Sequence, residues 1–493
     1  MVKELVGNLN IYWEVCNYKM AIVLGGGLSG LSAAYYLTKK YSNTKFKLLL
    51  LEASKRVGGW VDSEVNPGYV FEAGPRTIRP VGAQGINTLN MIDELNLSDR
   101  VVPIKPDHPA VKTRMVYANN SLHKLPSSFM ELLYTKKPFS KPLYKAILHD
   151  WKSGQPPELE DDTMYNFVER RFGKDLADYA ISPMICGICA GDAKEISVKF
   201  LMSHLFEMEQ KHGGVVKGLF GGGFKKMNIE KSPEMSFLAR KSRQEKWSIY
   251  SLEGGLEVLP KTLYETVIRN GGKIFPEHRI EELKFYNDNE RVSVKIKENY
   301  SFCGDHLVSS LPAYELARLL KKNHSELSEE LASIPFVDVA VINLQYDAKD
   351  LIKDDGFGFL VPPLENLPIL GVIFDSCCFK DQKGTVLTVM MGGKWFEERF
   401  GNNPTSEHLL EVATTQLKNI MGITDKPNAF KVNILKKCIP QYIIGHHDRV
   451  KRIREYIKDK NLPISLCGSS YDGVGVNDVI LSAKKAVANF SLH

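Results

Sequence analysis

Hydrophobic positions near the start of the chain follow two different spacings. Short apolar runs at Met20–Leu24 and Phe46–Leu51 are typical of strands that are buried on both faces. Between them, Leu28–Lys40 has apolar residues three or four positions apart, which predicts a helix with one buried face. The three segments together predict a strand, helix, strand unit of the kind from which parallel sheets are built.

The middle of the chain has a helical pattern, and strands return after it. From about Leu122 to Gly222, helical segments are separated by Pro or Gly. The predicted helices are Met130–Tyr134, Leu143–Trp151, Met164–Phe172 and Phe200–Glu209. After Tyr250 the predicted strands include Arg291–Lys297, Val337–Gln345, Ile369–Phe374 and Val386–Met391.

The end of the chain returns to the pattern of its beginning. A strand at Ile464–Leu466 is followed by a Gly-rich turn and by a helix from about Asn477. This order predicts a mixed α/β and α+β fold, in which a Rossmann-type nucleotide domain is assembled from distant segments, with helical and sheet-rich insertions between them.

Composition narrows the class of protein only a little. The chain has 493 residues, 43% of them hydrophobic, and a net charge of +6. It is long enough for one large core or two to three ordinary ones, and its charge neither requires nucleic acid nor excludes an anionic membrane surface. We expect no nucleic-acid partner. No apolar run approaches the roughly 20 residues of a spanning helix.

Two local features are assigned no chemistry. Residues 1–19 contain two Glu but no Arg or Ser, which fits neither a transit peptide nor a secretory signal, so we exclude this leader from the fold as a candidate mis-start. The eight scattered cysteines indicate reduced thiols. Cys186 and Cys189 form a Cys-x-x-Cys without a thioredoxin-like context, and we expect them to pack a loop.

A glycine-rich motif joins the first predicted strand to the first helix. In the run GGGLSG, Gly25, Gly27 and Gly30 allow a tight turn, a close approach to pyrophosphate and close packing of helix on strand. The helix would direct its free N–H groups at the phosphates. Glu52, at the end of the next strand, can accept hydrogen bonds from ribose hydroxyls and would repel a 2′-phosphate, so NAD or FAD is favoured over NADP.

The choice between these cofactors depends on a resemblance. The stretches RVGGW (Arg56–Trp60) and FEAGPR (Phe71–Arg76), with the closing run GSSYDGVGVND (Gly468–Asp478), resemble motifs of the flavin amine oxidase and protoporphyrinogen oxidase superfamily. The resemblance implies FAD as the cofactor. It implies that FAD contacts Gly25, Gly26, Gly27, Leu28, Ser29, Gly30, Glu52, Ala53, Arg56, Gly59, Trp60, Gly74, Pro75, Arg76, Thr77, Ile280, Ser469, Val474, Gly475 and Val476.

A narrower resemblance extends from about Met20 to the C-terminus. The stretches that carry it are GPRTIRP (Gly74–Pro80), DHPA (Asp107–Ala110), LPA (Leu311–Ala313), GFGFLVP (Gly356–Pro362) and IPQY (Ile439–Tyr442). They are similar to the mitochondrial-type protoporphyrinogen oxidase family. The resemblance implies an oxygen-dependent, six-electron oxidation of protoporphyrinogen IX to protoporphyrin IX in three rounds, each producing hydrogen peroxide, as the penultimate step of haem synthesis. Flavin N5 would accept the hydride, and no catalytic side chain is assigned.

The resemblance also implies a set of substrate-binding residues. Arg114 matches an arginine that binds a propionate, and a guanidinium can bind a carboxylate through two hydrogen bonds. The macrocycle would be lined by Gly187, Phe357, Gly358 and Leu360. The chain departs from the family pattern in having Cys186 and Phe359, where members often have Arg and His. His108, His446 and His447 are not at ligand spacing, so no metal is expected.

The resemblance divides the chain into a leader, an FAD-binding domain in three parts and two insertions. The FAD-binding parts are 20–107, 223–310 and 441–493. The helical membrane-binding and substrate-lining domain is 108–222, and the substrate-binding sheet domain is 311–440.

Lysines alternate with large apolar residues in Ser127–Ser153, which predicts either an amphipathic segment lying in a membrane interface or a helix packed on its own domain. The resemblance favours peripheral binding to the mitochondrial inner membrane on its intermembrane-space side, and it implies a homodimer and hand-over of porphyrin to ferrochelatase. Two other functions stay open: a flavin amine oxidase, and a non-catalytic member of the fold resembling a GDP dissociation inhibitor.

Overall fold

Five strands from separate parts of the chain form one parallel sheet in the computed structural model. The structure describes residues 19–42, 44–220, 234–286, 290–297, 300–379 and 382–488. In spatial order the strands are β19 (Ile464–Leu466), β13 (His306–Ser309), β1 (Lys19–Leu24), β2 (Phe46–Leu51) and β9 (Lys273–Phe275). Every neighbouring pair is parallel. The prediction of a Rossmann-type domain assembled from distant segments is therefore confirmed.

The two faces of this sheet bury different cores, because side chains alternate along each strand. In β1, Ala21 and Val23 face a core made with five helices, whereas Ile22 and Leu24 face a second core. The five helices are α2 (Leu28–Lys40), α3 (Gly82–Glu94), α11 (Phe237–Gln244), α12 (Val258–Arg269) and α19 (Val476–Ala488). The second core is closed by β10 (Ile280–Tyr286), β11 (Arg291–Ile296), β12 (Ser301–Gly304), α13 (Ala313–Leu320), α14 (Ser325–Ala332) and α18 (His446–Asp459).

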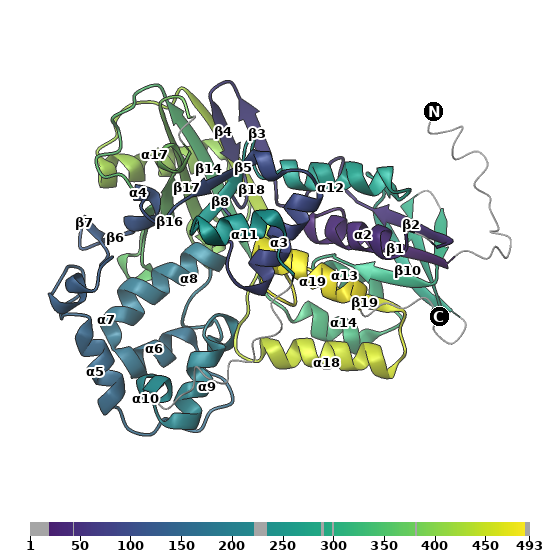
Figure 1. The fold of residues 1–493 in the computed structure, drawn as a ribbon, viewed down its shortest axis with the longest axis horizontal. Helices are drawn as coiled ribbons and strands as arrows, with labels where there is room; N and C mark the ends of the chain where they lie inside the picture. The colour runs from purple at the N-terminus through teal and green to yellow at the C-terminus, as the bar shows by residue number, and fades with distance from the viewer. Residues whose placement is uncertain are drawn as a thin grey trace.

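A second, seven-stranded sheet lies beside the Rossmann-type domain (Figure 1). Its order is β18 (Ala429–Pro440), β14 (Phe336–Tyr346), β17 (Thr385–Gly393), β16 (Ile369–Phe374), β15 (Gly358–Leu360), β6 (Met115–Ala118) and β7 (Ser121–Lys124). All pairs are antiparallel except β15 with β6. Helix α17 (Ser406–Met421) packs on one face, and α8 (Ser182–Cys189) packs on the other.

Helices between residues 144 and 220 form a lobe below the second sheet in Figure 1. Its longer members, besides α8, are α5 (Tyr144–Lys152), α6 (Met164–Phe172), α9 (Ser203–His212) and α10 (Val215–Phe220). Buried charges join them: Arg171 donates to Glu209 and lies 3.7 Å from Asp150, whose carboxylate accepts hydrogen bonds from the backbone N–H groups that begin α10. Removing one partner of such a buried pair would leave an uncompensated charge, so this network holds the lobe together.

Short elements connect these layers. Strands β3 (Ser63–Asn66) and β4 (Tyr69–Glu72) form a hairpin, and β5 (Val101–Ile104) pairs with β8 (Ile249–Leu252). The short helices are α4 (Pro109–Lys112), α7 (Lys174–Leu176), α11 (Phe237–Gln244), α15 (Asp375–Cys378) and α16 (Phe396–Phe400).

The predicted helices between 122 and 209 needed the largest adjustments. The chain first forms β7, then a 3₁₀ turn at Met130–Leu133, and α9 begins only at Ser203 after another 3₁₀ turn. Pro126, Pro138 and Pro142 lack the N–H that a continuous helix needs, which explains why regular helix starts only at Tyr144. Residues 1–18 of the leader lie outside the described residues, and the domain boundaries stay a prediction.

Candidate active site

The turn between β1 and α2 leaves room on only one side of its glycines. A Cβ on Gly30 would lie 1.9 Å from the carbonyl oxygen of Gly25, and a Cβ on Gly25 would lie 2.7 Å from Ser310 Oγ. A Cβ on Gly27 would meet only the Cα of Gly59, at 3.8 Å. Gly25 and Gly30 are therefore required by packing, whereas Gly27 faces space that a ligand can approach.

A second glycine turn lies against the first. Gly58 donates its N–H to the carbonyl of Gly26 at 2.8 Å and forms a parallel bridge with Gly27. Arg56 holds this turn from behind, since its guanidinium donates to the carbonyl oxygens of Val57 and Gly59. Arg56 was predicted to contact the cofactor, and in the structure its hydrogen bonds shape the loop that includes Gly59.

Glu52 ties the end of β2 to the first glycine turn. Its Oε2 accepts a hydrogen bond from the N–H of Gly26 at 2.6 Å, and its Oε1 accepts from the N–H and hydroxyl of Ser54 at 2.7 Å each. Next to it, the backbone of His278 donates to the carbonyl of Glu52, which brings the chain leading to Ile280 alongside. Ala53 lies exposed beside this acid, and Ile280 is buried in the second core.

The closing motif, Gly468–Asp478, lies next to the glycine turns. Helix α19 begins at Val476, and a Cβ on Gly468 would lie 3.6 Å from the hydroxyl of Ser29. Ser29 Oγ in turn donates to the carbonyl of Val479, at 3.4 Å. The structure thus brings Ser469, Val474, Gly475 and Val476 onto a loop next to the N-terminal turn, although the two lie more than 400 residues apart.

These features fit the phosphates and ribose of a dinucleotide. Among the described residues, no side chain caps the start of α2, and its first turn has no acidic residue, while Leu28 is buried beneath it. The free N–H groups at such an end attract a pyrophosphate. The bare edge of Gly27 leaves space for it, and Glu52 supplies a fixed carboxylate nearby.

The stretch after β4 crosses close to the second glycine turn. A Cβ on Gly74 would lie 2.0 Å from the carbonyl oxygen of Trp60, whose own side chain is exposed. Pro75 and Thr77 are half-buried on either side of Arg76, which is buried and pairs with Asp375 at 3.0 Å. Arg76 was predicted to contact FAD, and the structure gives its guanidinium a protein partner.

Glu72 lies in the same buried region as this ion pair. It accepts hydrogen bonds from Ser63 Oγ at 2.7 Å and from the N–H of Leu256 at 2.8 Å. Burial raises the pKa of Glu72 to about 7, and burial also raises the pKa of Asp375. Burial thus disfavours the ionised form of both carboxyl groups, while the charge of Arg76 favours it.

The residues predicted to line the macrocycle gather on β15 and its neighbours. Phe357 donates its N–H to the carbonyl of Thr113, directly before Arg114, at 3.3 Å. Gly358 has a φ of +133°, and a Cβ there would lie 2.0 Å from the carbonyl of Val372. From the α8 side, Gly187 faces Leu360: a Cβ added to Gly187 would lie 2.9 Å from Leu360 Cδ2. One region therefore contains all five predicted residues.

Arg114 lies at the exposed edge of this region, close to a second arginine. Partial burial and then the charge of Arg79 lower the pKa of Arg114. Among the described side chains, neither guanidinium has a carboxylate partner, which is the arrangement that an acidic ligand requires. The carbonyl of Arg79 accepts from Asn477 of α19 at 2.7 Å, so the arginine edge is also tied to the closing motif.

Sequence reasoning missed Arg79, Glu72, Asp375 and Tyr442. Arg79 belongs to the quoted stretch GPRTIRP and Tyr442 to IPQY, so their motifs were signals, but no local pattern assigned them a role.

Among the described residues, no three metal-ligating side chains form a cluster. Cys186 and Cys189 are buried free thiols on α8. His108 caps α4, and His446 is completely buried.

Known proteins match this chain over nearly its whole length. A family model described as flavin containing amine oxidoreductase matches residues 28–489. The protoporphyrinogen oxidases of Bos taurus and Homo sapiens are 37% and 36% identical to the chain, covering 95% and 96% of it and 98% of each relative. A solved structure from Exiguobacterium sp., provisionally described as a protoporphyrinogen oxidase, has the same fold, with a TM-score of 0.77 at 23% identity over 95% of this chain and 98% of that one. The chain therefore belongs to the flavin-containing amine oxidoreductase family and, within it, to the protoporphyrinogen oxidases.

Proposed function

We propose that the chain is an FAD-dependent oxidase that converts protoporphyrinogen IX to protoporphyrin IX. The observation that carries the proposal is the gathering of Arg114, Gly187 and the Phe357–Leu360 segment in a chain 37% identical to a protoporphyrinogen oxidase over 95% of its length. When bound, FAD supplies a two-electron acceptor that dioxygen can reoxidise to hydrogen peroxide. Removal of six electrons and six protons from one porphyrinogen consumes three dioxygen molecules and yields three hydrogen peroxide molecules.

The chain's own residues bind and orient the two partners. Gly27 and the uncapped start of α2 would receive the pyrophosphate, and Glu52 would accept from the ribose. Arg114, with Arg79 beside it, would bind the propionates at the outer edge of the site. Phe357 and Leu360 offer apolar surface to the macrocycle. No side chain is assigned as acid or base, because positioning the substrate at the flavin is the protein's main task.

We also propose that the helical lobe binds the surface of a membrane. Large apolar side chains are exposed along the 3₁₀ turn, α5 and the end of α10: Phe129, Met130, Leu133, Tyr134, Ile147, Leu148, Trp151 and Phe220. Exposed Lys137, Lys141 and Lys145 lie among them in the sequence. Of the helices that the structure describes, none is long and apolar enough to cross a bilayer. An apolar surface with basic residues is suited to an anionic membrane interface.

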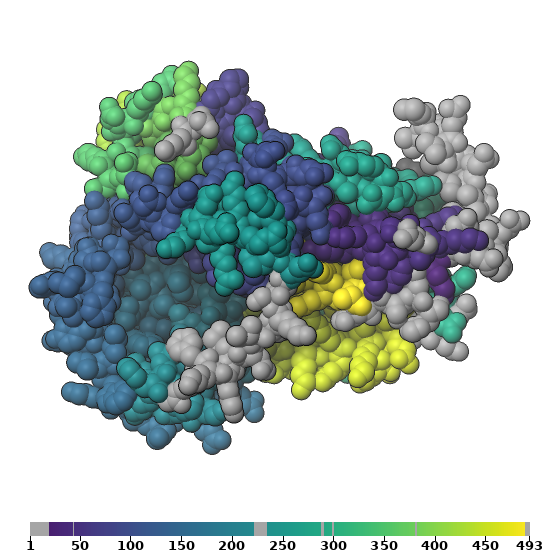
Figure 2. Space-filling view, viewed as in Figure 1, coloured from purple at the N-terminus to yellow at the C-terminus, as the bar shows by residue number. Residues whose placement is uncertain are grey.

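The lobe that carries this surface forms the end of the molecule opposite β1 and β2 (Figure 2). Insertion there would leave the nucleotide domain in water. A location on the mitochondrial inner membrane, facing the intermembrane space, together with a homodimer and porphyrin hand-over to ferrochelatase, rests on the family resemblance and stays a prediction.

An anaerobic assay with the purified flavoprotein tests the activity. Protoporphyrinogen IX is mixed with the protein without oxygen, air is admitted, and porphyrin fluorescence and hydrogen peroxide are followed together. We expect about three peroxide molecules per porphyrin formed, faster than in a protein-free control. Turnover of an amine without turnover of the porphyrinogen would instead identify an amine oxidase. A colourless protein that does not take up FAD would identify a non-catalytic member of the fold.

A further inference from the structure

The segment Ile439–Tyr442, one of the stretches that carry the narrower resemblance, connects three parts of the molecule. Ile439 and Pro440 end β18, and the chain then runs between the helical lobe and the loop of the closing motif. The amide of Gln441 donates to the carbonyl of Cys189 at the end of α8, at 2.9 Å. The carbonyl of Tyr442 accepts from the N–H of Ser197 in the lobe, at 2.8 Å.

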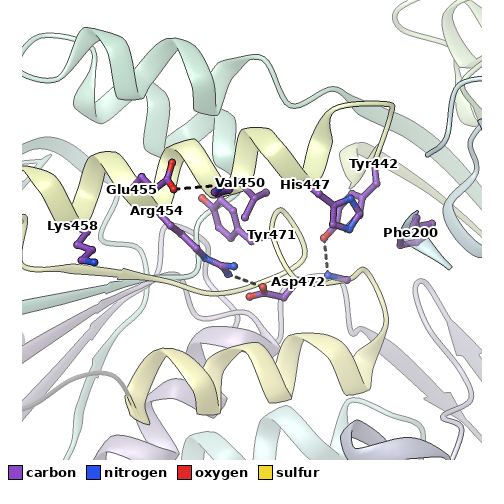
Figure 3. A pocket seen from close by; sticks show the side chains of 11 residues that line it. Phe200, Tyr442, His447, Val450, Arg454, Glu455, Lys458, Tyr471 and Asp472 are labelled. Atoms are coloured by element: carbon purple, nitrogen blue, oxygen red, sulfur yellow. Dashed lines mark hydrogen bonds and ion pairs between the residues drawn. The ribbon is translucent and has the colours of Figure 1, made fainter. Parts of the chain in front are cut away.

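The hydroxyl of Tyr442 makes two hydrogen bonds to the loop that leads into α19. It donates to the carbonyl oxygen of Ser469 at 2.6 Å. It also accepts from the N–H of Gly473 at 2.7 Å (Figure 3). Burial raises the pKa of Tyr442, which keeps this hydroxyl protonated and able to donate. One side chain therefore fixes both ends of the segment from Ser469 to Gly473.

The ring that carries this hydroxyl is itself held on two sides. It stacks on His446, with ring centroids 3.7 Å apart and planes 17° apart, and Phe200 contacts it edge to face at 5.0 Å. His446 is completely buried, and burial lowers its pKa to about 3, so the stacked imidazole is neutral. The position of the hydroxyl is thus fixed by packing from α18 and from the helical lobe.

Packing alone does not hold the outer side of the loop. A cavity of about 480 Å³ lies between the loop and α18, lined by Tyr442, Tyr471, Asp472 and Gly473 among others (Figure 3). On this side the loop is held by the two bonds to Tyr442 and by Arg454, which donates to Asp472 at 2.6 Å. Directional bonds matter most where a protein layer is missing, because a loose loop could move into the cavity.

We propose that Tyr442 is a positioning residue for the flavin, acting through its hydroxyl on the Ser469–Gly473 loop. The inference rests on the proposed placement of FAD beside Ser469, Val474, Gly475 and Val476. The role assigned to Tyr442 includes no contact with the reacting atoms. It sets the path of the backbone that enters α19 and links that path to Ser197 and Phe200 of the helical lobe.

The variant Tyr442→Phe tests this role, since it keeps the stacked ring and removes only the hydroxyl. The dissociation constant of FAD from the apoprotein is expected to rise roughly tenfold, the cost of leaving two buried loop groups unpaired. The visible absorbance of the bound flavin should lose resolved fine structure, and its midpoint potential should differ from that of the wild type. A role confined to global stability would move neither the spectrum nor the potential.

Tyr165→Phe is the matched control. Like Tyr442, Tyr165 is a buried tyrosine whose hydroxyl makes two hydrogen bonds, but it lies within the helical lobe. Its hydroxyl donates to Asp178 at 2.8 Å and accepts from Lys174 at 3.1 Å. Its loss should lower the unfolding temperature and leave FAD affinity unchanged. Wild-type FAD affinity, spectrum and potential in folded Tyr442→Phe would overturn the proposal, as would an equal loss of FAD affinity in Tyr165→Phe. A wild-type protein without FAD would overturn the proposed function and this inference together.

Discussion

The carboxylate of Glu52 accepts a hydrogen bond from the backbone N–H of Gly26, with 2.6 Å between the two atoms. The acid at the end of β2 is thereby tied to the glycine turn at the end of β1, and the two parts of a nucleotide site are held as one unit. Both oxygens of the carboxylate are used, because Oε1 accepts two hydrogen bonds from Ser54. Glu52 therefore shapes the turn as well as offering its remaining lone pairs to a ribose.

Glu52→Gln should weaken FAD binding about tenfold without unfolding the protein. An amide has only one acceptor oxygen, so one of the donors from Gly26 or Ser54 would face an N–H₂ group, and the turn would shift. Titration of the apoprotein with FAD measures the effect. Glu281→Gln on β10, an exposed acid in the same domain, serves as the control and should bind FAD like the wild type. Equal affinity in both variants would contradict the role of Glu52.

Alanine substitutions at Gly27 and Gly30 should have different effects: the first should prevent FAD binding, and the second should prevent folding. Gly30→Ala would press a methyl group into the carbonyl of Gly25, since the Cβ would lie 1.9 Å from that oxygen, and we expect little soluble protein. Gly27→Ala has space within the protein and should fold. Its methyl group would fill the side that the pyrophosphate approaches, so purified Gly27→Ala should lack flavin colour. Circular dichroism and flavin absorbance distinguish the outcomes, and a yellow Gly27→Ala protein would argue against this edge as the phosphate site.

The nucleotide turn could be predicted from sequence because its determinants lie close together in the chain. Gly25, Gly27 and Gly30 have fixed spacing, and Glu52 follows within one strand, helix, strand unit, so periodicity and motif spacing identify them. The bounds of α2 and β2 agreed with the prediction residue for residue.

Contacts between distant segments leave no such local pattern. Arg76 and Asp375 pair across 299 positions. Tyr442 bonds to Ser469 and Gly473 at a point where the helical lobe, α18 and the closing loop meet. Neither pairing follows from local propensity or from residue spacing. The macrocycle residues could be named only through family resemblance, because Arg114 in isolation has the pattern of an ordinary surface arginine.

Arg114→Ala should raise the KM for protoporphyrinogen about tenfold and change kcat little. A propionate salt link at the exposed edge binds substrate and transition state alike, so its loss affects binding more than chemistry. Neighbouring Arg79 would retain part of the attraction, which limits the loss, and Arg114→Lys should fall between alanine and the wild type. Steady-state kinetics test this, with exposed Lys426→Ala between α17 and β18 as a control. An unchanged KM would remove Arg114 from the propionate site.

Glu72 should make the protein less stable as the pH rises toward neutrality. Burial raises its pKa from 4.5 to about 7, so the folded state holds a proton that the unfolded state releases. The stabilisation is complete below pH 4.5 and is lost as the pH rises through about 7, at a cost of about 3 kcal/mol. Glu72→Gln carries no such proton, so its free energy of unfolding should depend less on pH in this window.

Denaturant unfolding at several pH values measures this difference. Glu64→Gln on the neighbouring strand is the control, because hydrogen bonds from Asn66 and Lys431 lower the pKa of Glu64 and move its titration below this window. If wild type and Glu72→Gln had parallel stability profiles between pH 4.5 and 7, Glu72 would have to be ionised in the folded protein.

Replacing exposed aromatic side chains of the helical lobe should release the protein from membranes. Phe129 and Trp151 are 74% and 50% exposed, and their transfer into an interface would contribute about 1 to 2 kcal/mol each. Phe129→Ser with Trp151→Ser should therefore reduce sedimentation with anionic vesicles at least tenfold, while FAD content and unfolding temperature stay unchanged. Phe430→Ser, an equally drastic change at a 54% exposed position on β18, should sediment like the wild type. Equal loss in both proteins would mean that vesicle binding reflects general surface hydrophobicity, and no loss in either would exclude this surface as the membrane contact.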